Sequence, residues 1–178
     1  MTTASDAISG SDRRFLDAAM ELAEHGRCSA APNPTVGALL VKDGEVLGRG
    51  YHVRPGSHHA EAAAIADAKS RGHGTALRGA TAYVTLEPCA FHGRTPACCE
   101  ALAELGVARV VGALTDPHPR VAGSGYGHLR DAGVQVTALE LPRARTLIEG
   151  YWSRVVHGRP FVRLKVAASL DGRTAMAS

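Results

Sequence analysis

The sequence predicts an α/β fold, because segments with helical periodicity alternate with short β-prone segments along most of the chain. Two properties of the whole chain agree with one domain of this class. Its 178 residues are enough to bury a substantial core. Its hydrophobic content is 45%, yet no apolar run reaches the ~18 residues that a membrane-spanning helix needs. The sequence therefore indicates a globular protein with no membrane partner.

The predicted elements follow one another with short connections. Helices are expected where apolar residues recur every three or four positions, and strands where β-branched and apolar residues run together. The predicted helices cover residues 13–25, 60–71, 98–105, 126–132 and 142–156. The predicted strands cover residues 36–41, 45–51, 80–86, 108–114 and 134–139.

Local signals define the first elements. Ser11 and Asp12 can cap the first helix, which leaves residues 1–12 as a flexible N-terminus. The two prolines around Asn33 predict a rigid turn before the first strand, and Asp43-Gly44 predicts the hairpin turn after it. Asn33 thus lies at the mouth of a hairpin. It either serves turn geometry alone or presents an amide to a substrate hydroxyl.

The C-terminal segment breaks the pattern. Residues 161–167 look like a buried strand and residues 169–173 like a turn that follows it. No further strand follows to pair with this one. We therefore expect residues 160–168 to lie outside the sheet, and the helix that ends near Val156 to close the domain.

Composition restricts the classes of partner. Charged residues make up 21% of the chain, the net charge is +3 and aromatic residues are only 4%. This basic bias suits a phosphorylated small molecule, but it is too weak and too poor in aromatic residues to predict a nucleic-acid groove. Three of the four cysteines fall within eleven positions, which favours metal ligands in a reducing compartment over disulfides. The first ten residues lack the apolar region of a signal peptide, so a cytoplasmic location is expected.

One constellation carries recognisable chemistry. His59 and Glu61 stand at the start of a predicted helix, and Cys89 and Cys98 flank a loop of eight residues. One imidazole and two thiolates are three zinc ligands, which leaves the fourth tetrahedral position for water, as in catalytic sites. Glu61 would then carry protons. A His-x-Glu motif followed by Pro-Cys and a further Cys is typical of zinc-dependent nucleobase deaminases.

A purely structural zinc site is the main alternative for these residues. It would need a fourth ligand such as Cys99. However, adjacent residues at a helix start point about 100° apart and rarely reach the same ion, and Glu61 would have no role. Cys98 at a helix start should also have a lowered pKa, which suits a metal ligand. We interpret Cys28 as a spare thiol and Glu87 as a structural carboxylate.

Several motifs together resemble the deaminase half of the bifunctional riboflavin-biosynthesis deaminase/reductase family. The match covers roughly residues 13–178, and its most specific part is the eight-residue loop, because cytidine and tRNA-adenosine deaminases have Cys-x-x-Cys. The motifs are Pro32-Asn33-Pro34-x-Val36-Gly37, Val41-Lys42-Asp43-Gly44, Gly50-Tyr51-His52, His59-Ala60-Glu61, Thr85-Leu86-Glu87-Pro88-Cys89, His92-Gly93-Arg94-Thr95-Pro96 and Asp116-Pro117.

The resemblance implies a three-layer α/β/α cytidine-deaminase-like fold with a central mixed sheet of about five strands. It implies a deaminase domain over residues 13–158 that removes the ring 2-amino group of 2,5-diamino-6-(5-phosphoribosylamino)pyrimidin-4(3H)-one. By position, Zn²⁺ would be held by His59, Cys89 and Cys98, with Glu61 as the proton shuttle. The implied substrate contacts are Asn33, His52, Arg94 and Asp116. Arg94 is the best candidate for the phosphate, since a guanidinium is always charged and can bind bidentately.

Three departures from the family pattern stand out. Ala90-Phe91 replaces a frequent Ser-His, and His118 stands where many members have Asn, which leaves room for a related aminopyrimidine or nucleobase as substrate. Residues 159–178 resemble the truncated beginning of a reductase domain, so no NADPH site is expected in this chain. A homo-oligomer is compatible with this reading. Two rivals remain, a deaminase acting on nucleic acid and a non-catalytic zinc module that partners a separate reductase.

Overall fold

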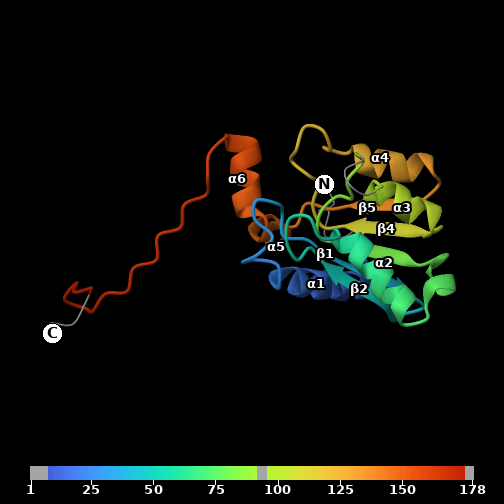
Figure 1. Ribbon diagram of the computed structural model, residues 1–178, viewed down its shortest axis with the longest axis horizontal. Coiled ribbons are helices and arrows are strands. Elements are labelled where there is room, and N and C mark those ends of the chain that lie inside the picture. Colours follow the sequence, from blue (N-terminus) through green and yellow to red (C-terminus); the bar gives the residue numbers. More distant parts are fainter. Residues whose placement is uncertain (1–7, 92–95, 175–178) are drawn as a thin grey trace.

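The computed structural model describes residues 8–91 and 96–174, where a five-stranded sheet carries helices on both faces (Figure 1). The strands are β1 (Gly37–Lys42), β2 (Glu45–Tyr51), β3 (Thr81–Val84), β4 (Arg109–Gly112) and β5 (Gln135–Ala138). The helices are α1 (Gly10–Glu24), α2 (Ala60–Ser70), α3 (Cys98–Glu104), α4 (Ser124–Asp131), α5 (Pro142–Leu147) and α6 (Glu149–His157), with a 3-10 turn η2 (Gly74–Leu77).

The sheet is mixed. Its strand order is β2-β1-β3-β4-β5, in which β1 pairs antiparallel with both β2 and β3. The strands β3, β4 and β5 are parallel to one another. Each parallel pair is connected through a helix, as parallel strands require. The carboxyl ends of β3 and β4 therefore open at the same edge of the sheet, and ligand sites in α/β folds form at such edges.

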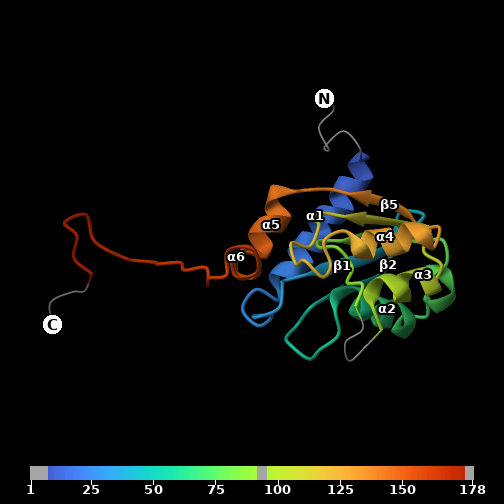
Figure 2. The same cartoon turned by 90° about the horizontal axis from the view of Figure 1, so that it is seen from above.

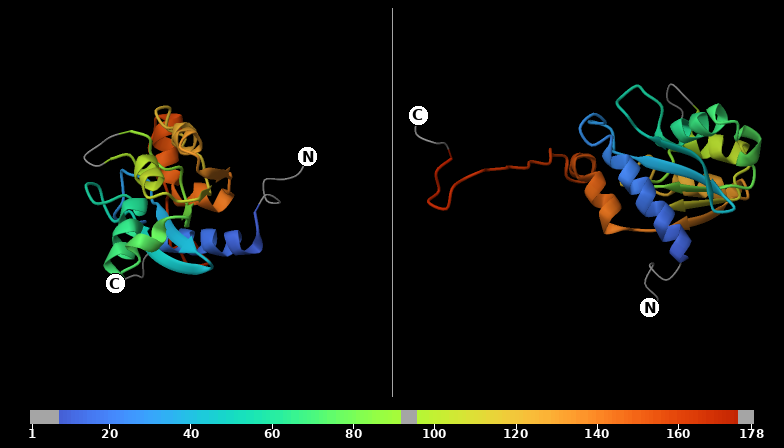
Figure 3. Two further views of the ribbon diagram at one scale, coloured as in Figure 1. Left: turned by 90° about the vertical axis from the view of Figure 1, so that its right-hand side faces the viewer. Right: turned by 90° about the horizontal axis from the view of Figure 1, so that it is seen from below.

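The helices make two layers around the sheet. Helix α1 packs on β1 and β3 and contacts α5, whereas α2 packs on β1 and β2 and contacts α3, which contacts α4 (Figures 2 and 3). The expected three-layer α/β/α arrangement with five strands is confirmed. Among the described residues, no helix has the length and apolar character needed to cross a membrane.

The first helix begins earlier than the sequence predicts. Ser9, not Ser11, is the N-cap, because its hydroxyl accepts a hydrogen bond from the backbone N–H of Asp12 while the Asp12 carboxylate accepts one from the backbone N–H of Ser9. Helix α1 therefore starts at Gly10. Both serines fit the capping pattern, so the sequence alone could not separate them.

Two predicted elements near the C-terminus differ from the structure. The helix predicted at residues 142–156 is two helices, α5 and α6, because the backbone leaves helical geometry at Ile148 (φ −111°, ψ 20°). The buried strand predicted at residues 161–167 is wrong. The segment is extended and exposed, with Leu164 84% accessible, since no described strand lies beside it to pair with (Figure 1). The sheet contains none of residues 160–168, as predicted.

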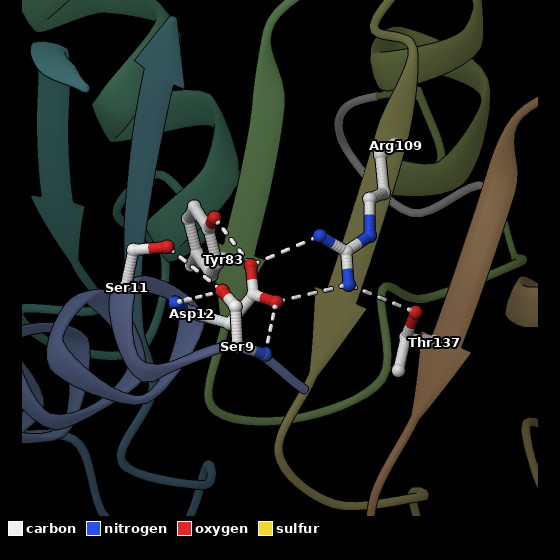
Figure 4. A network of polar contacts seen from close by, with 6 residues as sticks. All are labelled: Ser9, Ser11, Asp12, Tyr83, Arg109 and Thr137. Atoms are coloured by element: carbon white, nitrogen blue, oxygen red, sulfur yellow. Dashed lines mark hydrogen bonds and ion pairs between the residues drawn. The ribbon is translucent and has the colours of Figure 1, made fainter. Parts of the chain in front are cut away.

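A buried ionic network ties α1 to three strands (Figure 4). Asp12 is 3% exposed and accepts a bidentate pair from Arg109 on β4, at 2.9 and 3.2 Å, and a 2.7 Å hydrogen bond from the Tyr83 hydroxyl on β3. Arg109 also donates to Thr137 on β5. Burial disfavours the charge, but bonds from Tyr83, the Ser9 backbone and Arg109 outweigh it, so the pKa of Asp12 is lowered.

Helix α2 approaches the sheet closely because β2 presents glycines beneath it. A Cβ at Gly50 would lie 2.4 Å from both the carbonyl oxygen of Ala60 and the backbone nitrogen of Ala64. At Gly48 it would lie 2.2 Å from the Ala64 carbonyl oxygen. Helix α2 is rich in alanine on the same side, so backbone meets backbone with few side-chain atoms between them. The N-terminus of α2 is held firmly against the sheet as a result.

We predict that Gly50→Ala lowers the free energy of unfolding by about 1–3 kcal/mol, because α2 must move to admit the methyl group. Gly127→Ala in α4 is the matched control, since nothing lies within 4 Å of its Cβ position. In a helix that change should raise the free energy of unfolding by about 0.5–1 kcal/mol. Chemical denaturation of both variants measures the difference. Equal stabilities would contradict the close packing of α2 on β2.

Candidate active site

Three segments bring one histidine and two cysteines together. His59 is the N-cap residue of α2, Cys89 follows β3, and Cys98 is the first residue of α3. The Nδ1 atom of His59 lies 3.6 Å from Sγ of Cys89 and 3.4 Å from Sγ of Cys98. Tetrahedral zinc, with bonds of about 2.0–2.1 Å to nitrogen and 2.3 Å to sulfur, separates such ligands by about 3.6 Å. The two nitrogen–sulfur distances therefore match those of a zinc-bound set, and all three ligand atoms lie within 4.8 Å of one another.

The electrostatics of the two thiols suit a cation. Cys98 hydrogen-bonds to Cys89, and with the neighbouring His59 this lowers the pKa of Cys89 to about 4 against the opposing effect of burial. The same bond and burial raise the pKa of Cys98. The pKa of His59 is raised, chiefly by its hydrogen bond with Cys89. One thiolate is thus present at neutral pH, and a bound cation would favour the second.

The expectation that the helix start lowers the pKa of Cys98 itself is wrong. The backbone N–H of Cys98, at the start of α3, donates to Sγ of Cys89 at 3.4 Å. The helix end therefore stabilises negative charge on Cys89 rather than on its own first residue. Sequence position alone could not show which of the two sulfur atoms this N–H faces.

Glu61 lies in the first turn of α2, two residues after His59, and is only 4% exposed. Burial, followed by the negative charge of Cys89, raises the pKa of Glu61 to about 7. A carboxyl group with this pKa can accept and release protons near neutral pH. Its position beside the three ligand atoms agrees with the proton-carrying role that the sequence suggested.

The other two cysteines stand apart from this cluster. Cys99 is fully buried in the hydrophobic core, and burial raises its pKa to about 11. Cys28 is exposed. Among the described residues, the group of His, Cys, Asp and Glu side chains close enough to share a metal ion is His59, Cys89 and Cys98. The geometry thus opposes the alternative in which Cys99 completes a structural zinc site.

A cavity of about 310 Å³ opens above the cluster. Its volume suits a small molecule rather than a nucleic-acid duplex. Of the predicted substrate contacts, it brings together Asn33, His52 and Asp116 around Glu61. Arg94, the predicted phosphate contact, lies outside the described residues. The full lining is Asn33, Pro34, Val36, His52, His59, Ala60, Glu61, Leu86, Glu87, Cys89, Phe91, Asp116, His118, Arg120 and Tyr151.

His52 orients Asn33. The Nδ1 atom of His52 lies 3.0 Å from the carbonyl oxygen of His58, and its Nε2 lies 3.0 Å from Nδ2 of Asn33. A carbonyl only accepts, so Nδ1 carries the proton and Nε2 accepts from the Asn33 amide. The oxygen of Asn33 is then the atom left to accept a hydrogen bond in the cavity. His52 itself is 3% exposed and acts as a support for Asn33.

Glu87 is structural, as the sequence suggested, and it organises the loop that carries Asp116. Its carboxylate accepts hydrogen bonds from four backbone N–H groups, at 2.8–3.3 Å. The donors are Asp116, Gly123, Gly125 and Tyr126. The chain after β4 therefore folds around one buried side chain, which brings Asp116 to the cavity wall.

Two cavity residues escaped the sequence-based prediction, Arg120 and Tyr151. Arg120 places its guanidinium 5.5 Å from the centre of the Phe91 ring. Tyr151 comes from α6, far along the chain, and donates to Oδ1 of Asp116 at 3.0 Å. No local motif marks either residue. Only the way in which α6 packs beside the loop after β4 reveals the role of Tyr151.

The profile of the cytidine and deoxycytidylate deaminase zinc-binding region matches residues 9–114. This chain belongs to that family. The matched region includes His59, Glu61, Cys89 and Cys98, and it ends before Asp116. The predicted zinc-dependent deaminase family and its cofactor are thereby confirmed, and the cluster described above is the group that fits the metal among the described residues.

Full-length proteins similar to this family member are larger. The chain is 51% identical over 168 residues to riboflavin biosynthesis protein RibD of Escherichia coli (strain K12). The matched residues make up 94% of this chain and 44% of that protein. The structure of RibD from Acinetobacter baumannii superposes with a TM-score of 0.84 at 48% identity, over 94% of this chain and 46% of that one. The chain therefore spans about half the length of these relatives.

The name of a third similar protein states its activities. A diaminohydroxyphosphoribosylaminopyrimidine deaminase/5-amino-6-(5-phosphoribosylamino)uracil reductase from Thermotoga maritima superposes with a TM-score of 0.86 at 41% identity, over 93% of this chain and 47% of that one. The resemblance to the bifunctional riboflavin deaminase/reductase family, drawn from the sequence motifs, is confirmed.

We predict that Glu87→Gln weakens both stability and substrate binding. A neutral amide offers one acceptor oxygen instead of two, so backbone N–H groups of the loop after β4 lose their partner. The free energy of unfolding should fall by about 1–3 kcal/mol. KM should rise, because Asp116 is no longer held in place. Thermal unfolding and steady-state kinetics measure the two effects, and an unchanged melting temperature would contradict the structural role.

Proposed function

We propose that this chain hydrolytically deaminates 2,5-diamino-6-(5-phosphoribosylamino)pyrimidin-4(3H)-one to 5-amino-6-(5-phosphoribosylamino)uracil, a step of riboflavin biosynthesis. The supporting observation is the triangle of His59, Cys89 and Cys98 beside buried Glu61 at the base of a cavity. The identity of 51% to a riboflavin biosynthesis protein supports the choice of substrate.

In this proposal His59, Cys89 and Cys98 hold Zn²⁺. A zinc ion at this position supplies Lewis-acid activation of a water molecule near neutral pH. Glu61 removes a proton from that water, delivers it to the ring nitrogen and then assists protonation of the departing amine. Water replaces the ring 2-amino group, and ammonia leaves. Glu61 is suited to these transfers because it is buried in the cavity beside the proposed zinc ligands.

The substrate contacts follow from the cavity wall. The oxygen of Asn33, oriented by His52, accepts a hydrogen bond from one donor on the substrate, and the carboxylate of Asp116 accepts one from another. Arg94 contacts the phosphate in this proposal, on the strength of its position in the family motif. A related aminopyrimidine remains the second candidate substrate, because Phe91 and His118 line the cavity where many family members carry other residues.

The wider setting is also proposed. Residues 13–158 form the deaminase domain in this proposal, and residues 159–178 resemble part of a reductase-like domain. The partner is a phosphorylated aminopyrimidine, with no nucleic acid and no membrane, in the cytoplasm, and a homo-oligomer is compatible with the proposal. A non-catalytic zinc module is disfavoured because it would not need a carboxyl group such as Glu61 buried in the cavity beside the proposed ligands.

The ligand assignment predicts that Cys98→Ser loses most of its zinc, whereas Cys99→Ser keeps one zinc per chain. The two cysteines are adjacent in the chain, but only the sulfur of Cys98 lies 3.4 Å from Nδ1 of His59, while Cys99 packs in the core. Elemental analysis of the purified variants measures the metal. Loss of zinc from Cys99→Ser with retention in Cys98→Ser would show that the assignment is reversed.

The mechanism predicts that Glu61→Gln keeps zinc and fold but loses at least about 10²–10⁴-fold in kcat, because an amide cannot shuttle protons. The assay is ammonia release from the diaminopyrimidine phosphate, with dCMP as the comparison substrate. Wild-type enzyme should prefer the diaminopyrimidine. A kcat of Glu61→Gln within tenfold of the wild-type value would contradict the role assigned to Glu61. A wild-type preference for dCMP would contradict the proposed substrate.

A further inference from the structure

The cavity wall has two parts of different origin. The proposed metal ligands and Glu61 lie in residues 9–114, the region shared with other zinc-dependent deaminases. The rest of the cavity lining includes Asp116, His118, Arg120 and Tyr151, all outside that region. The residues proposed for catalysis therefore lie within the family region, whereas part of the cavity lining comes from the chain that follows it. This division directs attention to α6, the last helix.

We propose that α6 is a positioning helix for the deaminase substrate, in which Tyr151 fixes Asp116 and Arg154 fixes the turn that carries Asn33. The proposal rests on the proposed function, since it assigns those two side chains as substrate contacts. It adds that their geometry depends on a helix that the catalytic motifs do not include.

Tyr151 restricts the Asp116 carboxylate. The hydroxyl of Tyr151 donates to Oδ1 of Asp116 at 3.0 Å, and the backbone N–H of His118 donates to the same oxygen at 2.8 Å. Two donors thus occupy Oδ1, which leaves Oδ2 as the oxygen to accept from a substrate. Asp116 is 7% exposed, so few solvent molecules compete for its orientation. Removal of the Tyr151 hydroxyl would leave the backbone N–H of His118 as the remaining one of these two donors, so the carboxylate would be held less firmly.

Arg154 lies one helical turn after Tyr151 on the same side of α6. Its Nη2 atom donates to the carbonyl oxygen of Pro32 at 2.9 Å, and its guanidinium lies 5.6 Å from the centre of the Tyr151 ring. Pro32 directly precedes Asn33. One helix therefore holds both sides of the substrate-facing wall, with the loop after β4 on one side and the Asn33 turn on the other.

The effect of this arrangement should fall on binding more than on chemistry. Tyr151 contacts Asp116 and Arg154 contacts the carbonyl oxygen of Pro32, and neither Asp116 nor Pro32 belongs to the proposed zinc-ligand group, so we expect zinc content not to change when Tyr151 or Arg154 is substituted. Loss of orientation at Asp116 or Asn33 instead weakens contacts to the substrate. Tyr151 and Arg154 are positioning residues, because each acts through another side chain or turn.

The test is Tyr151→Phe, which removes only the hydroxyl. KM for the diaminopyrimidine phosphate should rise about tenfold, with kcat within threefold of wild type and zinc retained. Tyr83→Phe is the matched control, because Tyr83 also donates from its phenol to a carboxylate, that of Asp12, away from the cavity. It should lower the melting temperature and leave KM unchanged. Equal KM values for Tyr151→Phe and wild type would overturn the proposal.

A double-mutant cycle separates positioning from a general loss of stability. Tyr151→Phe lowers log(kcat/KM) by a certain amount in the wild-type background. In an Asp116→Asn background the same substitution should lower log(kcat/KM) by less than half of that amount, because both substitutions act on one contact. Full additivity would show that Tyr151 does not act through Asp116. If Tyr151→Phe does not fold, the KM of Arg154→Met tests the proposal instead. A KM rise of about threefold or more supports α6 as a positioning helix, and an unchanged KM overturns it.

Failure of the proposed function has a different signature. It appears in the wild-type enzyme, as deamination of another substrate in preference to the diaminopyrimidine. The same variants are then assayed with whichever aminopyrimidine or nucleotide the wild type deaminates, since the cavity is the same. A KM effect with that substrate supports the role of α6, and its absence rejects that role.

Discussion

The close approach of α2 to β2 is the constraint on which the active site depends. His59 and Glu61 lie at the N-terminus of α2, and their position relative to the two cysteines is set by how near that helix comes to the sheet. Glycines on β2 remove the side chains that would otherwise hold it away, and alanines on α2 do the same from the other side. A layer contact made of the smallest residues thus fixes the distances among the proposed metal ligands.

Three buried carboxylates show how environment assigns different roles to one chemical group. Asp12 is paired with Arg109, so it ties α1 to the sheet, and Glu87 accepts hydrogen bonds from backbone N–H groups, so it organises the loop after β4. Glu61 is different. Burial and the negative charge of Cys89 raise its pKa to about 7, although its own backbone N–H, His59 and the Cys98 thiol act in the opposite direction. Such a carboxyl group can exchange a proton near neutral pH.

Much of the site could be predicted from the sequence, because its chemistry needs residues at fixed separations along the chain. His59 and Glu61 must share the first turn of a helix, and Cys89 must follow a strand. The residues that orient the substrate are set by other means. Tyr151 reaches Asp116 only because α6 folds back beside the loop after β4, and the sequence carries no local signal for that contact.

The boundaries of elements were predicted less well for a related reason. The apolar run at residues 161–167 has strand propensity, but a strand exists only beside a partner, and the described sheet offers none. Likewise, the break between α5 and α6 at Ile148 occurs without a proline or glycine at that position. In both places tertiary contacts decide the outcome, and local sequence preference does not report them.

The four hydrogen bonds that end on Glu87 have a consequence for motion. Four backbone N–H groups, from Asp116, Gly123, Gly125 and Tyr126, donate to the same carboxylate. If that carboxylate moves away, all four hydrogen bonds are lost together. We therefore expect the two ends of the loop after β4, at Asp116 and at Gly123 to Tyr126, to loosen together, because one side chain holds both of them.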